Sequence, residues 1–545
     1  MAIRGALPGA NGLGQQGFRA PAPDRPARGL AVWPVKMTQP DPEISAAPPG
    51  EAAAEAATRP GHLRRSLRRA ADLLKGVSLA EWTLLAALAV YIWYFTRLSV
   101  RIHQGLGTSA FDLGLYDQGM WLMSRFKAPF VTLMGRNLFG DHTSFILLPL
   151  VPLYWLHAGV GTLFLLQSAA IAAGSIPVFL YARQRLRNEA VALLLAVGFL
   201  LHPALQWSNL EGFHPDAFLS VFLAFAIYAA LNSRWRMYLV FVLLIALVKE
   251  DTWLVLIPLG AWVAWRRRPE VGLATIAAAA VYPLALAPII LAAFTGVAWP
   301  NAWRIPFGGV GGLLTEAIRR PGNVTSYLWS EGRPWYVWQM TAPFALAFLR
   351  LPDVAVIGAV VLGTNTISTF FYQHSIGYHY SIVVVPALAL GTVHALGAMK
   401  DRWRVRMVVA VVLASLWAAL LWGPPPTART PVVYWEPDHP VAVAAREIMA
   451  EIPGDASVSA HYALCPHLSH REEVYMFPTP FSALLYGPGT TLEGQRLPAA
   501  DTVEYVLLQV YREPNDAKEW LTVAADFVLV DSNDWWELYR RKDAE

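Results

Sequence analysis

The sequence has few charged residues and almost no cysteine. Only 15% of its 545 residues are charged and 55% are hydrophobic, whereas a soluble domain has roughly 25% charged residues. So few charges cannot cover a soluble surface of this size, which excludes an ordinary cytosolic enzyme, a disordered chain and a fibrous one. The single cysteine, Cys465, excludes a disulfide framework and a cysteine-based zinc site. The composition therefore predicts that most of the chain lies in a membrane.

Several functional motifs are also missing. The sequence has no Walker loop, no Gly-x-Gly-x-x-Gly after a predicted strand and no nucleophile elbow centred on serine. These absences disfavour a pump driven by nucleotide hydrolysis. No short apolar run with a small-residue cleavage site lies near Met1, so the first residues do not read as a signal peptide. We also expect no nucleic-acid partner.

The chain divides into three predicted parts. Residues 1–75 are rich in proline, alanine, glycine and arginine, and are predicted to form a disordered basic tail. Residues 76–422 form a series of apolar segments, and residues 423–545 have a mixed composition. Basic residues before the first apolar segment predict that the amino terminus lies in the cytoplasm.

The middle part is predicted to be a membrane domain of about eleven transmembrane helices. Its large outer loops are expected at about residues 99–161 and 299–334. The apolar run from 142 to 156 is short and holds two prolines, so we interpret it as a re-entrant or interfacial helix. With the amino terminus inside, every short basic link falls on the cytoplasmic side, as the positive-inside rule requires. These links are 183–187, 234–236, 266–268 and 400–404.

The last part is predicted to be a small extracytoplasmic α/β domain. It opens on Gly-Pro-Pro-Pro from Gly423, which is a stiff break. The hydrophobic pattern predicts a helix over 441–449 and strands over 457–460, 474–477, 503–510 and 527–530. An odd number of spans places this domain outside the cell.

Ionisable side chains gather where the predicted spans reach the outer face. Such groups are costly at membrane depth and are functional candidates by default. Carboxylates, imidazoles, a lysine and tyrosines that converge at one face would form a polar cavity. The candidates are Asp112, Asp117, Asp141, His142, Glu211, His214, Asp216, Lys249, Glu250, Asp251, His374 and His379, with Tyr372, Tyr378 and Tyr380.

Structural roles remain open for several of these residues. Asp112 could cap a helix, and Asp117 lies about 140° around a helix from it, so the two need not face one site. The run Lys249 to Asp251 could form a structural ion network, because buried charges are usually paired. The spacing of His374 and His379 disfavours a metal site on one helix face. No cofactor is required, and a divalent cation held by carboxylates stays open.

The second outer loop offers arginines and tryptophans. Arg304 and Arg333 are candidates for binding phosphate, because the planar guanidinium group contacts two oxygens at once. The neighbouring tryptophans are favoured as anchors at the membrane interface over a role in stacking on a sugar.

Several runs resemble a family of membrane proteins known as domain of unknown function 2079. They are Phe111 to Gln118, Asp141-His142, Phe213 to Asp216, Lys249 to Asp251, Pro466 to Arg471 and Ala525 to Val530, in this order. The resemblance covers about residues 82–532. This family is in turn distantly similar to the type C glycosyltransferases, such as the protein O-mannosyltransferases and the aminoarabinose transferases.

The second similarity implies roles for individual residues. In type C enzymes the first outer loop carries a catalytic acid, often Asp-Glu followed three residues later by Tyr. Asp112 and Tyr116 match this pattern, but Leu113 replaces the Glu, so Asp112 is the matching acid unless Asp117 substitutes for it. His142 matches the His of a His-Pro-Pro-Leu-like run, with Thr143 and Ser144 in place of the prolines. Asp216 matches an acid of the next outer link.

We therefore expect a mainly α, type C-like membrane glycosyltransferase that transfers a sugar from a polyprenyl phosphate to an envelope glycan, lipid or protein. The reaction would be inverting, with Asp112 as the base or Asp117 in its place, and it would occur at the outer face of the bilayer. The expected substrate-binding residues are Tyr116, Asp141, His142, His214, Asp216, Lys249, Glu250, Asp251, Arg304, Arg333 and His379. The alternatives are a transporter or flippase, for which we see no inverted repeat, and a non-catalytic envelope assembly factor.

Overall fold

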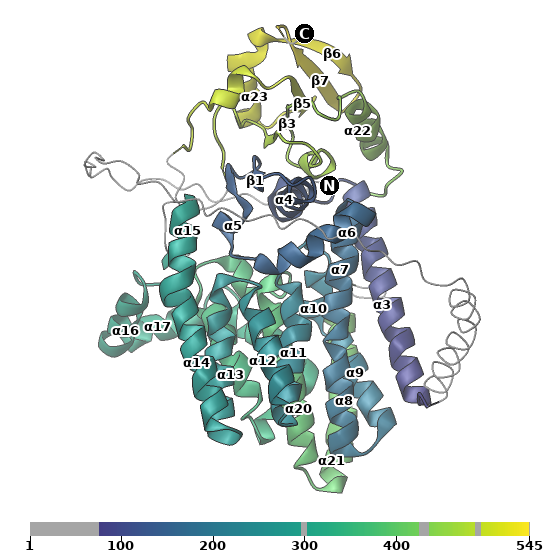
Figure 1. Ribbon diagram of the computed structural model, residues 1–545, viewed down its shortest axis with the longest axis vertical. Helices are drawn as coiled ribbons and strands as arrows, with labels where there is room; N and C mark the ends of the chain where they lie inside the picture. The colour runs from purple at the N-terminus through teal and green to yellow at the C-terminus, as the bar shows by residue number, and fades with distance from the viewer. Residues whose placement is uncertain (1–75, 296–301, 425–434, 486–491, 544–545) are drawn as a thin grey trace, which may run out of the picture. The chain divides into compact units, whose positions relative to one another are not determined.

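The computed structural model describes residues 76–295, 302–424, 435–485 and 492–543. The predicted disordered basic tail, residues 1–75, lies outside the described residues. Helices occupy most of the chain from Leu79 to Trp422, and a five-stranded sheet lies between Val458 and Arg541 (Figure 1). The expected mainly helical architecture with a small C-terminal α/β region is confirmed.

Five helices of the described residues are long and apolar enough to cross a membrane. Such a crossing needs about 20 apolar residues. Two of the five contain a local irregularity: Val160–Leu186 joins α7 (Val160–Ala173) to α8 (Ser175–Leu186), and Pro269–Thr295 joins α14 (Pro269–Val281) to α15 (Ala287–Thr295). The others are α3 (Leu79–Gln104), His379–Gly397, which ends in α20 (Val385–Gly397), and α21 (Asp401–Trp422).

The remaining helices are shorter. Several end at a proline or at a polar link, as α9 does before His202-Pro203. The expected number of about eleven spans therefore stays a prediction. The shorter helices of the bundle are α9 (Glu189–Leu200), α10 (Pro203–Ser208), α11 (Ala217–Leu231), α12 (Trp235–Ala246), α13 (Trp253–Arg266), α16 (Val310–Arg319), α17 (Pro321–Leu328), α18 (Arg333–Thr341) and α19 (Ala359–Ile367).

The first helix of the described residues, α3, begins at a capping box. The Ser78 side chain accepts a hydrogen bond from the Glu81 backbone, and the Glu81 carboxylate accepts one from the Ser78 backbone. Glu81 also accepts a 2.7 Å hydrogen bond from Arg183 near the end of α8. This pair fastens the start of α3 to one end of the helical bundle.

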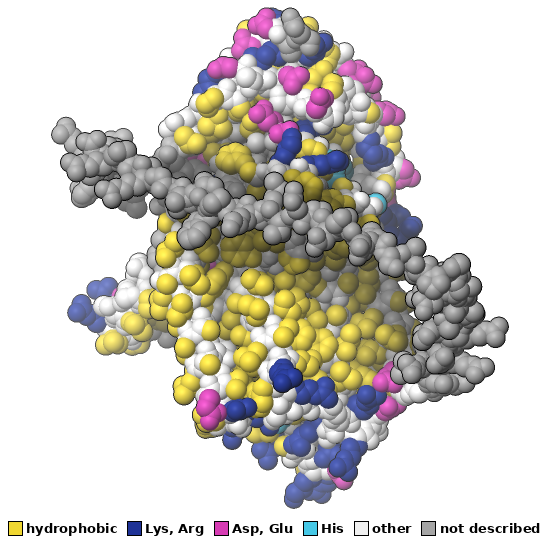
Figure 2. Space-filling view, viewed as in Figure 1, with side chains coloured by type: hydrophobic (Ala, Val, Ile, Leu, Met, Phe, Trp, Pro, Cys, Tyr) yellow, Lys and Arg dark blue, Asp and Glu magenta, His cyan; other side chains and the backbone are white. Residues whose placement is uncertain are grey.

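Basic side chains gather at that same end. The four basic links join α8 to α9, α11 to α12, α13 to α14, and α20 to α21. Figure 2 shows lysine and arginine side chains collected at the end of the bundle away from the C-terminal sheet, below a broad hydrophobic surface. The charge asymmetry is the one that the positive-inside rule describes, and the cytoplasmic location of this end stays a prediction.

The C-terminal sheet is mixed and has the order β4-β3-β5-β7-β6. Its first three strands are parallel and the last two pairings are antiparallel. The strands are β3 (Val458–Ala460), β4 (Val474–Met476), β5 (Tyr505–Gln509), β6 (Phe527–Ser532) and β7 (Trp536–Arg541), with helices α22 (Pro440–Ala450) and α23 (Pro514–Val523). The four expected strands and the helix over 441–449 are present, whereas β7 and α23 were not predicted.

The segment after α3, which was predicted to be the first outer loop and keeps that name below, lies between the bundle and the sheet (Figure 1). It contains α4 (Leu115–Ser124), the hairpin of β1 (Phe130–Val131) and β2 (Arg136–Asn137), α5 (Leu138–Asp141) and α6 (Val151–Leu156). The Thr132 hydroxyl donates a 2.6 Å hydrogen bond to the Val474 carbonyl and accepts one from the Val474 backbone. Ala110 donates its backbone N–H to the Tyr462 carbonyl at 3.0 Å. The C-terminal part therefore binds directly to this loop.

Candidate active site

Asp112 lies at a strained point of the first outer loop. Its backbone has φ 61° and ψ −89°, which is not helical, at a kink just before α4. A non-glycine residue in this region costs free energy and marks a candidate functional position. The carboxylate is 39% exposed, and its Oδ1 lies 3.2 Å from Nε2 of His214, whose side chain is 4% exposed. The loop thus presents one accessible carboxylate beside a buried imidazole.

The loop that carries His214 is held in place by Gln167 of α7. The Gln167 amide donates a 2.6 Å hydrogen bond to the Gly212 carbonyl and accepts one of 2.9 Å from the His214 backbone. Gly212 has φ 103°, a conformation that favours glycine. A Cβ atom at Gly212 would lie 3.7 Å from the Cβ of Asp112. Gln167 was not predicted from the sequence as a site residue. The feature that could have identified it is a single amide side chain within an apolar run.

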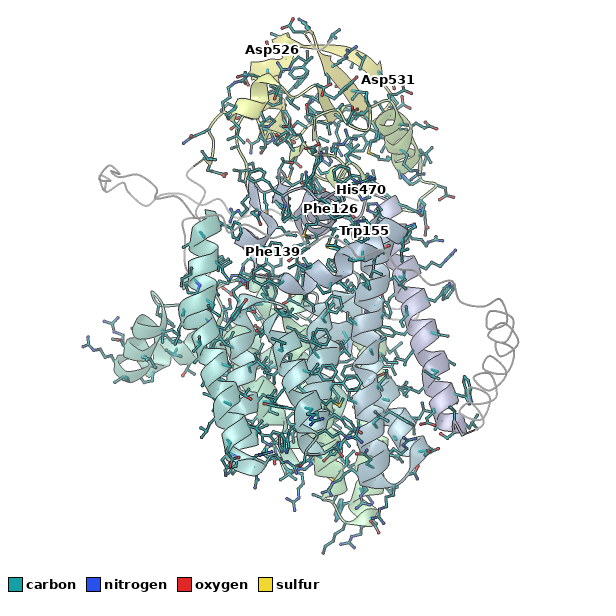
Figure 3. All side chains as sticks on the ribbon, in the orientation of Figure 1. Phe126, Phe139, Trp155, His470, Asp526 and Asp531 are labelled. Atoms are coloured by element: carbon teal, nitrogen blue, oxygen red, sulfur yellow. The ribbon has the colours of Figure 1, made fainter. Side chains whose placement is uncertain are left out.

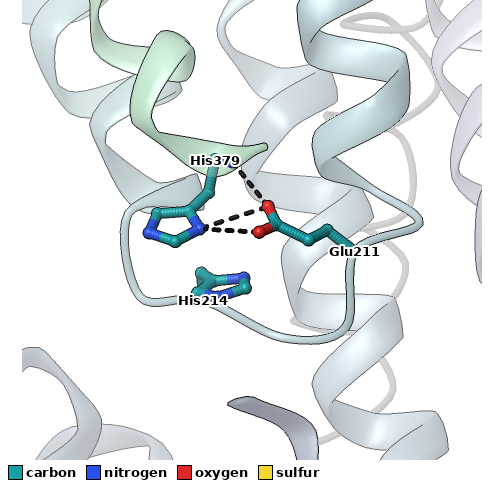
Figure 4. A group of neighbouring side chains, drawn as sticks. All are labelled: Glu211, His214 and His379. Atoms are coloured by element: carbon teal, nitrogen blue, oxygen red, sulfur yellow. Dashed lines mark hydrogen bonds and ion pairs between the residues drawn. The ribbon is translucent and has the colours of Figure 1, made fainter. Parts of the chain in front are cut away.

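Glu211, His214 and His379 form a compact group in which both histidines are buried and Glu211 is partly buried (Figure 4). Glu211 accepts a 2.5 Å hydrogen bond from the His379 backbone, and its carboxylate lies 3.1 Å from Nδ1 of His379. The two imidazole rings stack with centroids 3.7 Å apart. Donor atoms of the three side chains all lie within 4.8 Å of one another. Glu211 was noticed in the sequence but was not included among the expected substrate-binding residues.

The surroundings shift the pKa values of both Glu211 and His214. Burial raises the pKa of the Glu211 carboxyl to about 8, although the nearby His214 opposes the change. Burial alone would lower the pKa of His214, but the carboxylates of Asp112 and Glu211 outweigh it and raise that pKa to about 9. Strongly shifted groups beside an accessible carboxylate are typical of a functional site.

Two cations lie near the same tyrosine. Lys249 Nζ is 3.6 Å from Asp216, and its side chain is 4% exposed. The Lys249 ammonium and the Arg304 guanidinium each lie 5.6 Å from the centre of the Tyr380 ring. Nε of Arg304 is buried and makes no hydrogen bond within the described residues. Positive charge from two distant segments therefore meets at Tyr380.

A second acid–imidazole pair lies next to Lys249 in the sequence. Glu250 contacts Nδ1 of His142 at 2.8 Å and accepts a 3.1 Å hydrogen bond from the Thr143 backbone, and Asp141 lies 3.7 Å from the same imidazole. Burial would raise the pKa of Glu250, but His142 outweighs it and lowers that pKa to about 2. Burial raises the pKa of the adjacent Asp251.

Asp117 has different partners from Asp112. It is 1% exposed and accepts hydrogen bonds from Tyr154 at 2.7 Å and Ser469 at 2.5 Å. His470, labelled in Figure 3, lies 3.1 Å from the same carboxylate. The ring of Tyr116, in contrast, packs against that of His214 with centroids 6.3 Å apart. The two expected acids therefore separate: Asp112 joins the bundle cluster and Asp117 joins the C-terminal part.

Arg333 also contacts its own surroundings. Its guanidinium donates to the Tyr327 hydroxyl at 2.8 Å, to the Ser330 hydroxyl at 3.0 Å and to the Ser368 carbonyl at 3.1 Å. Its side chain is 1% exposed and lies 2.9 Å from Glu331. These contacts connect α17 to the segment after α19 through Arg333, and a role of Arg333 in substrate binding stays a prediction.

The family that matches this sequence is described as predicted membrane proteins (DUF2079), and the match covers residues 102–543. The chain belongs to this family. The match includes the Asp112, His214, Lys249 and His379 segments as well as the C-terminal sheet. The family membership expected from the sequence is thus confirmed.

Two solved structures resemble this family member. One is a crystal structure of ArnT from Cupriavidus metallidurans bound to undecaprenyl phosphate, with a TM-score of 0.49 and 12% identity, over 85% of this chain and 98% of that chain. The other is ArnT from the same organism in the apo state, with a TM-score of 0.48 and 12% identity, over 84% of this chain and 97% of that chain. The comparison with curated proteins gave no match.

Proposed function

We propose that the chain is an integral membrane glycosyltransferase with a type C-like architecture. In this proposal it moves a sugar from a polyprenyl phosphate to an acceptor of the cell envelope, at the outer face of the bilayer. The observation that carries the proposal is the accessible, strained Asp112 beside the buried His214, next to cations contributed by other segments. A lipid-linked donor leaves its tail in the bilayer while its polar head enters this cluster.

Asp112 is assigned the role of general base. Its side chain is accessible, while a turn in an unfavourable backbone conformation and the contact with His214 fix its position. A base must reach the proton that it removes, and Asp112 is better exposed for this than the fully buried Asp117. His214 lies beside this carboxylate, and its ring also packs against that of Tyr116.

The leaving phosphate needs positive charge. Lys249 and Arg304 both contact the Tyr380 ring, and Nε of Arg304 makes no hydrogen bond within the described residues. A phosphate oxygen would supply the acceptor that this group lacks. Placing fixed cations where charge develops lowers the barrier to the transfer.

The proposed step is a single displacement at the anomeric carbon. The acceptor hydroxyl gives its proton to Asp112 as its oxygen bonds to that carbon. The bond from the carbon to the phosphate oxygen breaks on the opposite side, and the polyprenyl phosphate leaves with the electron pair. The configuration at the sugar is therefore inverted, and no nucleotide is consumed.

The C-terminal sheet is assigned to the acceptor. It contacts the loop of Asp112 through Ala110 and Thr132. An acceptor glycan, lipid or protein held by this part would thus lie next to the proposed base.

The test uses a strain that lacks the gene and is complemented with the wild-type chain or with Asp112→Asn. Envelope glycans and lipid-linked sugars are compared by mass spectrometry, at equal membrane levels of both proteins. The proposal predicts that a defined sugar is lost from one glycan in both the deletion and the variant. Asp117→Asn is the matched control, because it makes the same change at an acid outside the cluster. The amount of sugar that it restores should follow the amount of folded variant in the membrane. Full restoration by Asp112→Asn would instead favour transport or assembly.

A further inference from the structure

We propose that Glu211, His214 and His379 bind one divalent transition-metal ion, of which Zn²⁺ is the best fit. The three side chains come from two segments, the link before α11 and the segment that leads into α20. Their donor atoms all lie within 4.8 Å of one another. Figure 4 shows the carboxylate of Glu211 facing His379, with the ring of His214 stacked beside that of His379.

The donor atoms are close enough to share one ion after closure of the group and rotation of one imidazole ring. Zinc bonds to nitrogen and carboxylate oxygen are about 2.0–2.2 Å long, so two donors of a tetrahedral site lie about 3.3 Å apart. The His214 and His379 rings stack with centroids 3.7 Å apart and planes 19° from parallel, so one ring must rotate to direct its nitrogen at an ion shared with the other. Nδ1 of His379 and the Glu211 carboxylate are 3.1 Å apart. Metal binding requires that both imidazoles offer a lone pair and that the carboxyl is ionised, so the ion would displace the protons that the group holds without it.

A second observation points to a missing ligand. His214 is buried, yet neither of its ring nitrogens makes a hydrogen bond within the described residues. The Asp112 oxygen lies 3.2 Å from Nε2 but is poorly aligned for a hydrogen bond. Buried polar groups are nearly always satisfied. A metal ion would complete the coordination of His214.

The surrounding shell is built to hold these donors. The His379 backbone donates to Glu211, and Gln167 fixes both the Gly212 carbonyl and the His214 backbone. Groups that orient the ligands are characteristic of functional metal sites. The backbone of the link is thereby fixed before any ion arrives.

The donor set selects the metal. Two imidazoles and one carboxylate favour zinc and related transition metals over Mg²⁺, which prefers oxygen ligands. Three protein ligands leave an open position, as in catalytic zinc sites, and Asp112 lies beside it. If the proposed transfer is correct, an ion here would add positive charge next to the base and the donor phosphate. The binding itself does not depend on that function.

The experiment measures metal binding by the full chain, purified in detergent, stripped with a chelator and supplied with neither donor nor acceptor. We expect one Zn²⁺ per chain by elemental analysis after desalting, and excess Mg²⁺ should not displace it. Glu211→Gln and His379→Gln should each weaken Zn²⁺ binding at least tenfold. His374→Gln is the matched control, because it removes a buried imidazole from the neighbouring turn and should leave binding unchanged.

Co²⁺ provides a readout that needs no variant. The absorption spectrum of the Co²⁺-loaded wild-type chain should indicate four or five ligands including imidazole nitrogen. A spectrum of six-coordinate, oxygen-ligated Co²⁺, or Zn²⁺ binding that survives Glu211→Gln and His379→Gln, would overturn the proposal. Either outcome leaves the proposed transferase intact, because no transfer is measured.

Discussion

The hydroxyl of Ser469 donates a 2.5 Å hydrogen bond to the carboxylate of Asp117 across 352 residues of sequence. Tyr154 donates to the same carboxylate, and His470 lies 3.1 Å from it. The His470 ring also stacks on Trp121, with centroids 6.0 Å apart. This joint couples α4, which directly follows the turn of Asp112, to the C-terminal part of the chain.

The joint is expected to contribute stability. Ser469→Ala leaves one oxygen of a buried carboxylate without its donor, and we expect a loss of about 1–3 kcal/mol in the free energy of unfolding. Thermal unfolding of the purified chain measures the loss, with Ser532→Ala, an exposed serine of β6, as the control. Unchanged stability in Ser469→Ala would contradict this assignment.

Gln167→Leu should disturb the site without touching the proposed base. The substitution leaves the Gly212 carbonyl and the His214 backbone N–H without their partner. We expect at least a tenfold loss of the transferred sugar at equal membrane levels, because the link that holds Glu211 and His214 is no longer fixed. Gln184→Leu is the control. It removes an amide of α8 that donates to the Tyr228 hydroxyl of α11, and it should have little effect on the transferred sugar. An equal loss in both variants would show that the effect is general.

Lys249 can be tested apart from its ion pair with Asp216. Lys249→Met alone leaves a buried carboxylate unpaired, which lowers the free energy of unfolding by about 3–5 kcal/mol. A loss of activity in this variant could then come from unfolding or from the missing cation. Adding Asp216→Asn removes the unpaired charge and should restore the folded protein. We expect the double variant to fold and still to lack transfer, because the cation for the donor phosphate is gone. Recovery of transfer in the double variant would assign Lys249 a structural role.

The C-terminal part should lose stability in mild acid. Burial lowers the pKa of both His461 and His467 to about 4 from a usual value of 6.5. The folded state therefore binds fewer protons than the unfolded state, so stability is complete above pH 6.5 and falls as the pH drops toward 4. The loss is at most roughly 3 kcal/mol per histidine.

Thermal unfolding between pH 7.5 and 4.5 measures this dependence. His461→Gln removes one of the two titrating groups, and the decline in melting temperature with acid should become shallower. His157→Gln, at an exposed histidine of the first outer loop, is the control. An unchanged pH profile in His461→Gln would contradict the prediction.

The sequence predicted the parts of the fold that depend on local patterns. The apolar runs indicated the membrane helices, and the basic links between them do lie at one end of the bundle. Both features could be predicted because each depends only on residues close together in the sequence. Strand β7 was missed because Trp536–Arg541 follows β6 closely and carries four charged or tyrosine side chains in its middle and end. Its pairing with β5 and β6 depends on contacts that no local pattern reports.

The sequence identified many of the residues that form the candidate site, but not which of them contact one another. The polar runs at the predicted outer face identified Asp112, His214, Lys249 and His379, and the structure brings them into one neighbourhood. The separation of Asp117 from Asp112 could not be predicted, since its partner Ser469 lies in the last part of the sequence. The bracing of Arg333 by Tyr327 and Ser368 is likewise a tertiary contact.

The most direct measurement follows labelled sugar on the polyprenyl carrier in cells with the wild-type chain or Asp112→Asn, at equal membrane levels. After a pulse, the label should move from the lipid to the envelope in wild-type cells. In the variant we predict transfer slowed by about 10²–10⁴-fold, which is the usual contribution of a positioned general base, with the label held on the lipid. Movement of the label at the wild-type rate in Asp112→Asn would contradict the assignment of Asp112 as the catalytic base.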